Sequence, residues 1–299
     1  MARASVIAAD QPLEPPIREE FERRPEADTD VGDVERPLSW FETITNVTAV
    51  RRLFILAAIA LVWQLYGTWL SNPLMFPSFA ATAEAFFDAL LNGGLLLKAW
   101  VSVWVLLKGY ALAVLIAAVL TSLAVSTRLG NDLLTTLTSM FNPLPAIALL
   151  PMALLWFGLG DGSLIFVLIH AVLWPLSLNT HSGFMSVSDT LRMVGRNCGL
   201  TGVRYVTRIL IPAAFPSILA GLKIGWAFAW RTLIAAELVF GISSGSGGLG
   251  WFIFENKQEL YISYVFAGLA TVILIGLLVE NVVFRTIENA TVRKWGMLR

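Results

Sequence analysis

Residues 100–126 read WVSVWVLLKGYALAVLIAAVLTSLAVS, and Lys108 is the only charged residue in this stretch. A helix needs about 20 predominantly apolar residues to cross the hydrocarbon core of a bilayer. The strands of a membrane barrel alternate apolar and polar residues over about 10 positions. This stretch is longer and does not alternate, so it predicts a membrane-spanning helix.

Five further stretches have the same character, and together they predict an all-α integral membrane protein with six transmembrane helices. The other predicted spans are residues 53–70, 133–157, 163–184, 213–240 and 260–283. The third of these contains Pro143, Pro145 and Pro151, which are expected to break or bend it. A broken helix at membrane depth is tolerated where it lines a cavity. Residues 142–151 are therefore expected to form part of the wall of a passage through the membrane domain.

The composition excludes several other classes of protein. The 299-residue chain is 57% hydrophobic and 14% charged, whereas an ordinary globular domain is about 45–50% apolar and about 25% charged. A soluble enzyme and a nucleic-acid-binding protein are therefore not expected. Cys198 is the only cysteine, which excludes an internal disulfide and a cysteine-based metal cluster. No metal site is expected.

Charge is distributed unevenly along the chain. Residues 1–50 carry a net charge of −6 and are expected to be a disordered cytoplasmic tail, with the six-helix membrane domain covering residues 51–299. Basic residues cluster before the first span, after the second, after the fourth and after the sixth. These are Arg36, Arg51, Arg52, Arg128, Arg192, Arg196, Arg204, Arg208, Arg285, Arg293, Lys294 and Arg299. By the positive-inside rule this alternation predicts that both termini are cytoplasmic.

The cytoplasmic loop 185–212 is too long to be a simple connection. Its apolar residues are spaced as in one or two short amphipathic helices. Asp189 is a candidate N-cap, with Ser186 and Ser188 as rivals. Pro212 is expected to open the fifth span, because proline is tolerated at a helix start. The loop is either a docking surface for a partner or an interfacial helix that lies on the lipid.

Two ionisable residues lie inside the fifth span. Arg231 and Glu237 are six positions apart, about 240° around a helix, and are expected to have separate partners. Arg231 either attracts an anion into the passage or forms a structural pair. His170 and His181 are expected to be hydrogen-bonded interior residues, with a proton relay as the alternative. Trp174, Trp226 and Trp230 are expected to be packing or belt residues, with an aromatic cage for the substrate as the alternative. The candidate pathway residues are Asn142, Pro145, Asn179, Trp230, Arg231 and Glu237.

Several short motifs carry a resemblance to a known family. Gly199 is followed, after nine residues, by Ile209-Leu210-Ile211-Pro212. This spacing resembles the E-A-A-three-G-nine-I-x-L-P loop of permease subunits of binding-protein-dependent ABC importers, although Met193-Val194-Gly195 replaces the leading triplet. Other fragments are similar to the nitrate/sulfonate/taurine branch of this family. They are Phe76-Pro77-Ser78, residues 145–151, residues 155–160, residues 212–216, Ala229-Trp230, Ala235-Ala236-Glu237 and Gly247-Gly248-Leu249-Gly250.

The resemblance covers residues 53–299 and implies the type I permease fold. It implies a second permease chain, in a homodimer, with two ATP-binding subunits, an extracytoplasmic solute-binding protein, membrane lipid around the chain, and no nucleic acid. The cytoplasmic loop would couple to the ATPase. The coupling residues implied are Arg192, Arg196, Gly199, Leu200, Arg204, Ile209 and Pro212.

The chain is expected to be a transport subunit and not an enzyme. No glycine-rich run is followed by Lys-Ser or Lys-Thr, so the chain should hold no cofactor, and ATP and Mg²⁺ should bind the partner. The resemblance implies import of a small anion, such as a sulfonate, taurine or nitrate, across the bacterial inner membrane. The alternative is an ion-gradient-driven secondary transporter, which often shows two inverted halves. Residues 243–250, rich in glycine and serine, are expected to be a turn before the last span.

Overall fold

A computed structural model describes residues 47–240 and 247–297, and the regular structure in these ranges is all helical, with no strand. The chain divides into two units, residues 1–55 and residues 56–299. The first turns of α2 belong to the first unit, and all the other described helices belong to the second. The helices are α2 (Thr48–Leu70), α3 (Phe79–Leu91), α4 (Leu95–Ser126), α5 (Arg128–Phe141), η1 (Ala146–Leu149), α6 (Leu150–Phe157), α7 (Asp161–Met185), α8 (Asp189–Asn197), α9 (Gly202–Tyr205), η2 (Val206–Leu210), α10 (Ile211–Phe240), α11 (Leu249–Gln258), α12 (Ile262–Leu278), η3 (Val279–Phe284), α13 (Arg285–Glu288) and η4 (Asn289–Arg293).

Five helical spans among the described residues are long and apolar enough to cross a membrane, and a bent pair makes up to six. The five are residues 48–70, 95–126, 161–185, 206–239 and 262–293. Each contains most of a predicted span and extends beyond it at one end or both. The predicted tail lies outside the described residues up to position 46. The first described helix, α2, begins at Thr48.

The third predicted span is not one straight helix. It is divided into α5 and the η1–α6 pair, which meet at an angle of 88°. The break falls at Asn142–Pro145, where Pro143 and Pro145 cannot donate a backbone hydrogen bond. The prolines therefore break this span, as predicted.

Two helices were not predicted, because both are too short for the span criterion. In α3 the Ser78 hydroxyl caps the first turn and accepts a hydrogen bond from the Ala81 N–H at 3.2 Å. In α11 the first residues are Leu249 and Gly250, which the sequence placed in a turn. Positions 243–246 of that predicted turn lie outside the described residues.

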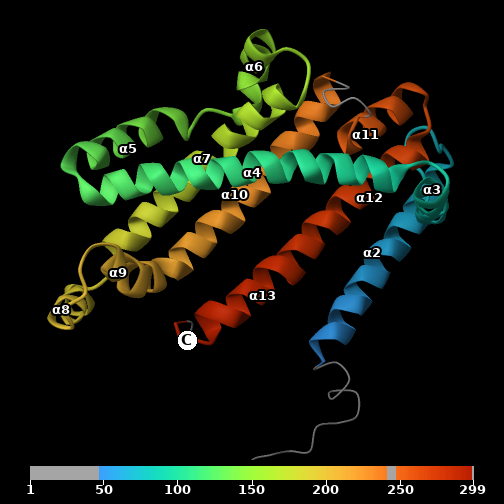
Figure 1. Cartoon of the computed structure of the whole chain (residues 1–299). Coiled ribbons are helices and arrows are strands. Elements are labelled where there is room, and N and C mark those ends of the chain that lie inside the picture. The colour runs from blue at the N-terminus through green and yellow to red at the C-terminus, as the bar shows by residue number, and fades with distance from the viewer. Residues whose placement is uncertain (1–46, 241–246, 298–299) are drawn as a thin grey trace, which may run out of the picture. The chain divides into compact units, whose positions relative to one another are not determined.

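The core of the second unit is built around α7. Figure 1 shows α7 and α10 side by side with α4 crossing them. Both α10 and α4 contact α7 extensively. Small residues allow this approach: a Cβ on Gly109 would lie 2.8 Å from Leu168, and one on Gly225 would lie 3.0 Å from Val172. Because α7 and α10 pack so closely, they are expected to move as one body.

Asp88, which lies in α3 outside the apolar spans, joins this helix to α12. The Tyr264 hydroxyl donates to Asp88 Oδ2 at 2.6 Å, and Asn92 Nδ2 donates to Oδ1 at 3.0 Å. These hydrogen bonds, chiefly the one from Tyr264, lower the pKa of Asp88. A depressed carboxyl pKa adds stability above the unfolded value of about 3.9, and this stability is lost as pH falls through the folded pKa. The contact is therefore complete at neutral pH.

Tyr264→Phe is expected to raise the pKa of Asp88 toward its ordinary value, since the phenol is its principal hydrogen-bond donor. The measurement is a carboxyl-carbon NMR titration of aspartate-labelled protein, with Asp88→Asn to assign the signal. Tyr261→Phe removes a neighbouring phenol with no described hydrogen bond to Asp88 and should leave the titration unchanged. An equal shift in both variants would contradict the assignment.

Candidate functional site

The loop 185–212, predicted to be cytoplasmic, folds into α8, a glycine turn and a second helical stretch. The Ser188 hydroxyl caps α8 and accepts from the Leu191 N–H at 3.4 Å, so the N-cap is Ser188 and not Asp189. Gly199 and Gly202 have φ of 71° and 54°, a left-handed conformation that favours glycine. The turn therefore depends on glycine at both positions.

Pro212 does not open the fifth span, contrary to the sequence expectation. The helix begins at Gly202 and continues through η2 into α10. In η2 the Ile211 N–H donates to the Val206 carbonyl five residues earlier, which is a π-helical bond. A proline ring clashes with the carbonyl four residues before it. The wider π-turn next to Pro212 is typical of places where a helix accommodates such a residue.

Two contacts attach α8 to the membrane helices. Gly195 is buried, and a Cβ there would lie 3.0 Å from both Ile209 and Tyr205. Arg192 donates to the Phe184 carbonyl, within the last turn of α7, at 2.6 Å and to the Val187 carbonyl, just beyond the end of α7, at 3.1 Å. Arg192 and Ile209, both predicted coupling residues, therefore hold α8 in place and are not its outward surface.

The outward surface of α8 is apolar with basic flanks. Met193 and Val194 are 56% and 49% exposed, and Leu191 is also exposed. The predicted coupling residues Arg196, Gly199 and Arg204 are exposed, Leu200 is half-buried, and Pro212 lies back in α10. An exposed apolar patch rimmed by polar residues is typical of a protein interaction site.

A cavity of about 380 Å³ lies where the third span is broken. It brings together three of the six predicted pathway residues, Asn142, Pro145 and Arg231. Its other polar lining comes from His170, Trp174 and Thr232. The guanidinium carbon of Arg231 lies 4.9 Å from the centre of the Phe228 ring, and Arg231 Nε donates to the Ala227 carbonyl at 3.1 Å.

The other three predicted pathway residues lie outside this cavity and have internal partners. Asn179 Nδ2 donates to the Pro175 carbonyl at 2.7 Å, and Trp230 Nε1 donates to the Val272 carbonyl at 3.2 Å. Glu237 is 1% exposed. Arg231 and Glu237 have separate partners, as predicted from their spacing.

Glu237 joins α4, α10 and α11. Its Oε2 accepts hydrogen bonds from the Gly250 N–H and the Ser102 hydroxyl, each at 2.8 Å. The Ser102 oxygen accepts in turn from the Leu249 N–H at 2.8 Å. Glu237 and Ser102 thus satisfy two backbone donors at the start of α11, where a negative charge is favourable. The signal available in the sequence was a glutamate inside an apolar predicted span, shortly before Gly-Gly-Leu-Gly.

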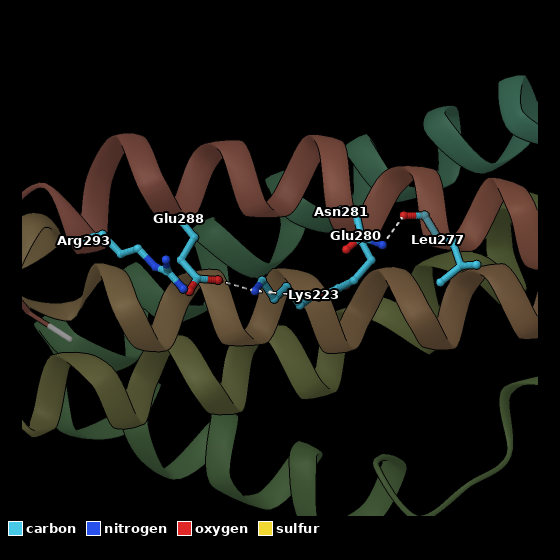
Figure 2. A network of polar contacts seen from close by, with 6 residues as sticks. All are labelled: Lys223, Leu277, Glu280, Asn281, Glu288 and Arg293. Carbon is cyan, nitrogen blue, oxygen red and sulfur yellow. Dashed lines mark hydrogen bonds and ion pairs between the residues drawn. The ribbon is translucent and has the colours of Figure 1, made fainter. Parts of the chain in front are cut away.

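Ion pairs tie other helices together. Lys223 of α10 donates to Glu288 Oε2 at 2.7 Å and lies 3.8 Å from Glu280 Oε1 (Figure 2). Arg293 Nε approaches the other oxygen of Glu288 at 3.6 Å. Lys108, the charge in the second span, pairs with Asp161 at the start of α7 at 3.0 Å. The Lys223 network connects the last helical segments to the helix that follows the coupling loop.

Lys223→Met and Glu288→Gln are expected to be non-additive, with a coupling free energy of about 1 kcal/mol, since the pair is partly shielded from solvent. The measurement is a double-mutant cycle on the free energy of unfolding in detergent micelles. The same cycle with Glu280→Gln should give a smaller coupling, because that carboxylate is 3.8 Å away and more exposed. Additive effects in both cycles would show that the Glu288 pair contributes no net stability.

The comparisons with known proteins agree with this architecture. The family model described as binding-protein-dependent transport system inner membrane component matches residues 109–288. An ABC transporter permease protein of Methanocaldococcus jannaschii is 31% identical over 242 residues, covering 80% of this chain and 90% of the relative. An aliphatic sulfonates transport permease protein of Escherichia coli is 29% identical over 229 residues, covering 76% and 85%. A nitrate import permease protein of Synechocystis sp. is 29% identical over 257 residues, covering 83% and 90%.

The matched region runs from α4 through the loop 185–212 to α13, so it includes the cavity, the α8 surface, and Lys223 with its partners Glu280 and Glu288. The chain belongs to the family of inner membrane components of binding-protein-dependent transport systems, as a transmembrane ABC transporter permease.

Proposed function

We propose that this chain is the permease subunit of an ATP-driven importer of a small anion, such as a sulfonate, taurine or nitrate. It works with a second copy of itself, two ATP-binding subunits and an extracytoplasmic solute-binding protein. It lies in the bacterial inner membrane with both termini in the cytoplasm. The observation that carries the proposal is the exposed apolar and basic surface of α8, held to α7 and α10 through Arg192 and Gly195.

The attachment of α8 explains how a partner could move the membrane helices. Arg192 links α8 to the end of α7, and Gly195 packs it on the helical stretch that continues into α10. Displacing α8 therefore displaces two helices that pack closely on each other. Rigid-body movement of packed helices is a common form of conformational switching. Arg231 of α10 and His170 of α7 line the same cavity, so the movement would change its shape.

ATP binding and hydrolysis belong to the partner in this proposal. When bound to the ATP-binding subunits, ATP and Mg²⁺ supply the energy for the closure of those subunits. The residues of this chain receive the motion through Val194 and its neighbours and transmit it through Arg192 and Gly195. The similarity to sulfonate and nitrate permeases supports the choice of an anion.

The test is affinity purification of the tagged chain from its native membrane, with identification of the co-purifying proteins. We expect stoichiometric recovery of an ATP-binding subunit with the wild type and its loss with Val194→Asp, which places a charge on the apolar surface of α8. Asn289→Asp adds the same charge at an exposed site away from α8 and should not change recovery. Recovery of the permease alone, with ion-driven uptake intact, would overturn the proposal in favour of a secondary transporter.

A further inference from the structure

We infer that the cavity at the break between α5 and η1 is a binding site for a small oxyanion within the membrane domain. The inference rests on the proposed transport function and adds to it a selective site on the permease itself. The donors assigned to the anion are the Arg231 guanidinium, the Trp174 indole N–H and the His170 imidazole, with Asn142 and Thr232 completing the polar lining.

The charge of the lining selects for an anion. Arg231 is the only lysine or arginine among the lining residues, and no aspartate or glutamate is among them. A guanidinium is always protonated, and its planar array of N–H groups matches the oxygens of an oxyanion. Arg231 Nε donates to the Ala227 carbonyl at 3.1 Å, which is the one hydrogen bond of this guanidinium among the described residues. The terminal nitrogens thus have no hydrogen bond among the described residues.

Two further donors in the cavity lack a partner. Trp174 is 8% exposed, and its Nε1 has no hydrogen-bond partner among the described residues. Both ring nitrogens of His170 are buried and likewise unpartnered there. A buried polar group without a partner costs free energy, and such exceptions in folded proteins call for an explanation. An anion in the cavity would accept hydrogen bonds from both side chains.

The donors are held by neighbouring rings. The ring of Trp174 stacks on Phe141 with centroids 5.3 Å apart and an interplanar angle of 15°, and His170 meets Trp174 edge-to-face at 6.0 Å. Pro143, Pro145 and Pro175 form rigid parts of the lining. A site whose donors are already in place loses less conformational entropy when a ligand binds.

The size of the cavity suits a small ligand. Ligand sites range from about 300 to 1,000 Å³, and this cavity holds about 380 Å³. With about 30 Å³ per water molecule, there is room for a small anion and part of its hydration shell. Aromatic rings alone could form a cage for an organic cation, but the Arg231 guanidinium would repel it. The oxyanion is therefore the ligand class that this lining favours.

The test uses the transporter complex as purified, placed in lipid nanodiscs without the solute-binding protein. Binding of sodium nitrate, taurine and sodium methanesulfonate is measured by titration calorimetry, with tetramethylammonium as a cation probe. We expect saturable binding of at least one anion and none of the cation. Arg231→Gln should weaken anion binding by about tenfold or more, and Trp174→Phe by about three- to tenfold.

Matched variants separate a ligand contact from a structural effect. Trp226→Phe removes another buried, unpartnered indole N–H on α10, but Trp226 is not among the lining residues and should bind as the wild type does. Arg231→Lys should retain more affinity than Arg231→Gln, since it keeps the charge without the planar array of donors. Each variant is also checked for monodispersity by size-exclusion chromatography.

ATP-dependent uptake is measured in parallel, so that failure of the site and of the proposed function can be distinguished. Normal uptake and binding in Arg231→Gln and Trp174→Phe would overturn the site and leave the importer intact. Absence of anion binding to the wild type, or binding of tetramethylammonium, would also overturn it. If no ATP-binding subunit is recovered, the importer fails, while the titrations on the permease still decide the site.

Discussion

Replacing Glu237 by alanine is expected to lower the free energy of unfolding by about 3 kcal/mol, because it leaves two buried donors without their acceptor. The donors are the Gly250 N–H and the Ser102 hydroxyl, and the site is closed to solvent. The measurement is denaturant unfolding of the purified protein in micelles. Because α11 is held through this carboxylate, proteolysis between α10 and α11 should also become faster.

Two variants complete the test of the Glu237 contact. Glu255→Ala removes an exposed carboxylate from α11 and should change stability little. Gly248→Ala should be destabilising although no hydrogen-bonding group is removed, since its Cβ would collide with the Glu237 carboxylate and the Ser102 hydroxyl. Equal stability of Glu237→Ala and Glu255→Ala would contradict a structural role for the buried glutamate.

Gly195→Leu is expected to reduce ATP-dependent uptake by at least tenfold while the protein still accumulates in the membrane. A side chain at this position collides with Tyr205 and Ile209, so α8 must move away from the helical stretch that leads into α10. The loop lies outside the main core of α4, α7 and α10, which should fold as before. The measurements are uptake into proteoliposomes and recovery of the ATP-binding subunit.

A second glycine of the same loop provides the comparison. Gly199 has open space around its Cα, and its constraint is a φ of 71°, which asparagine tolerates better than other residues. Gly199→Asn should therefore keep most of the uptake activity. Wild-type uptake in Gly195→Leu would mean that the packing of α8 on Tyr205 and Ile209 does not transmit the motion.

Features carried by a continuous stretch of sequence could be predicted well. The long apolar runs predict the spans, because a bilayer requires about 20 apolar residues in a row and the backbone must satisfy its own hydrogen bonds. The prolines at 143 and 145 predict the break in the third span, since proline lacks the N–H that a helix requires. The short helices α3 and α11 were not predicted, because neither is long enough to span a membrane.

The same distinction applies to the candidate sites: their local structure follows from the sequence, and the contacts between distant residues do not. The position and helical character of the coupling loop follow from local spacing, but which of its residues face inward does not. Arg192 was expected at a docking surface and instead binds the end of α7. His170 was expected to be hydrogen-bonded and Trp174 to be a packing residue. The structure places both in the lining of the cavity that Arg231 also lines, and their ring nitrogens have no hydrogen-bond partner among the described residues.

The sequence by itself determined that this is a helical membrane protein, where its spans lie, where one of them breaks, and that the loop after residue 185 has helical structure. These properties depend on hydrophobicity and backbone chemistry within one stretch of chain. Only the tertiary structure decided that Glu237 holds α11, that Lys223 meets Glu288, and that Arg231, His170 and Trp174 share a cavity. Those contacts join residues far apart in the chain, and their partners are set by how the helices pack.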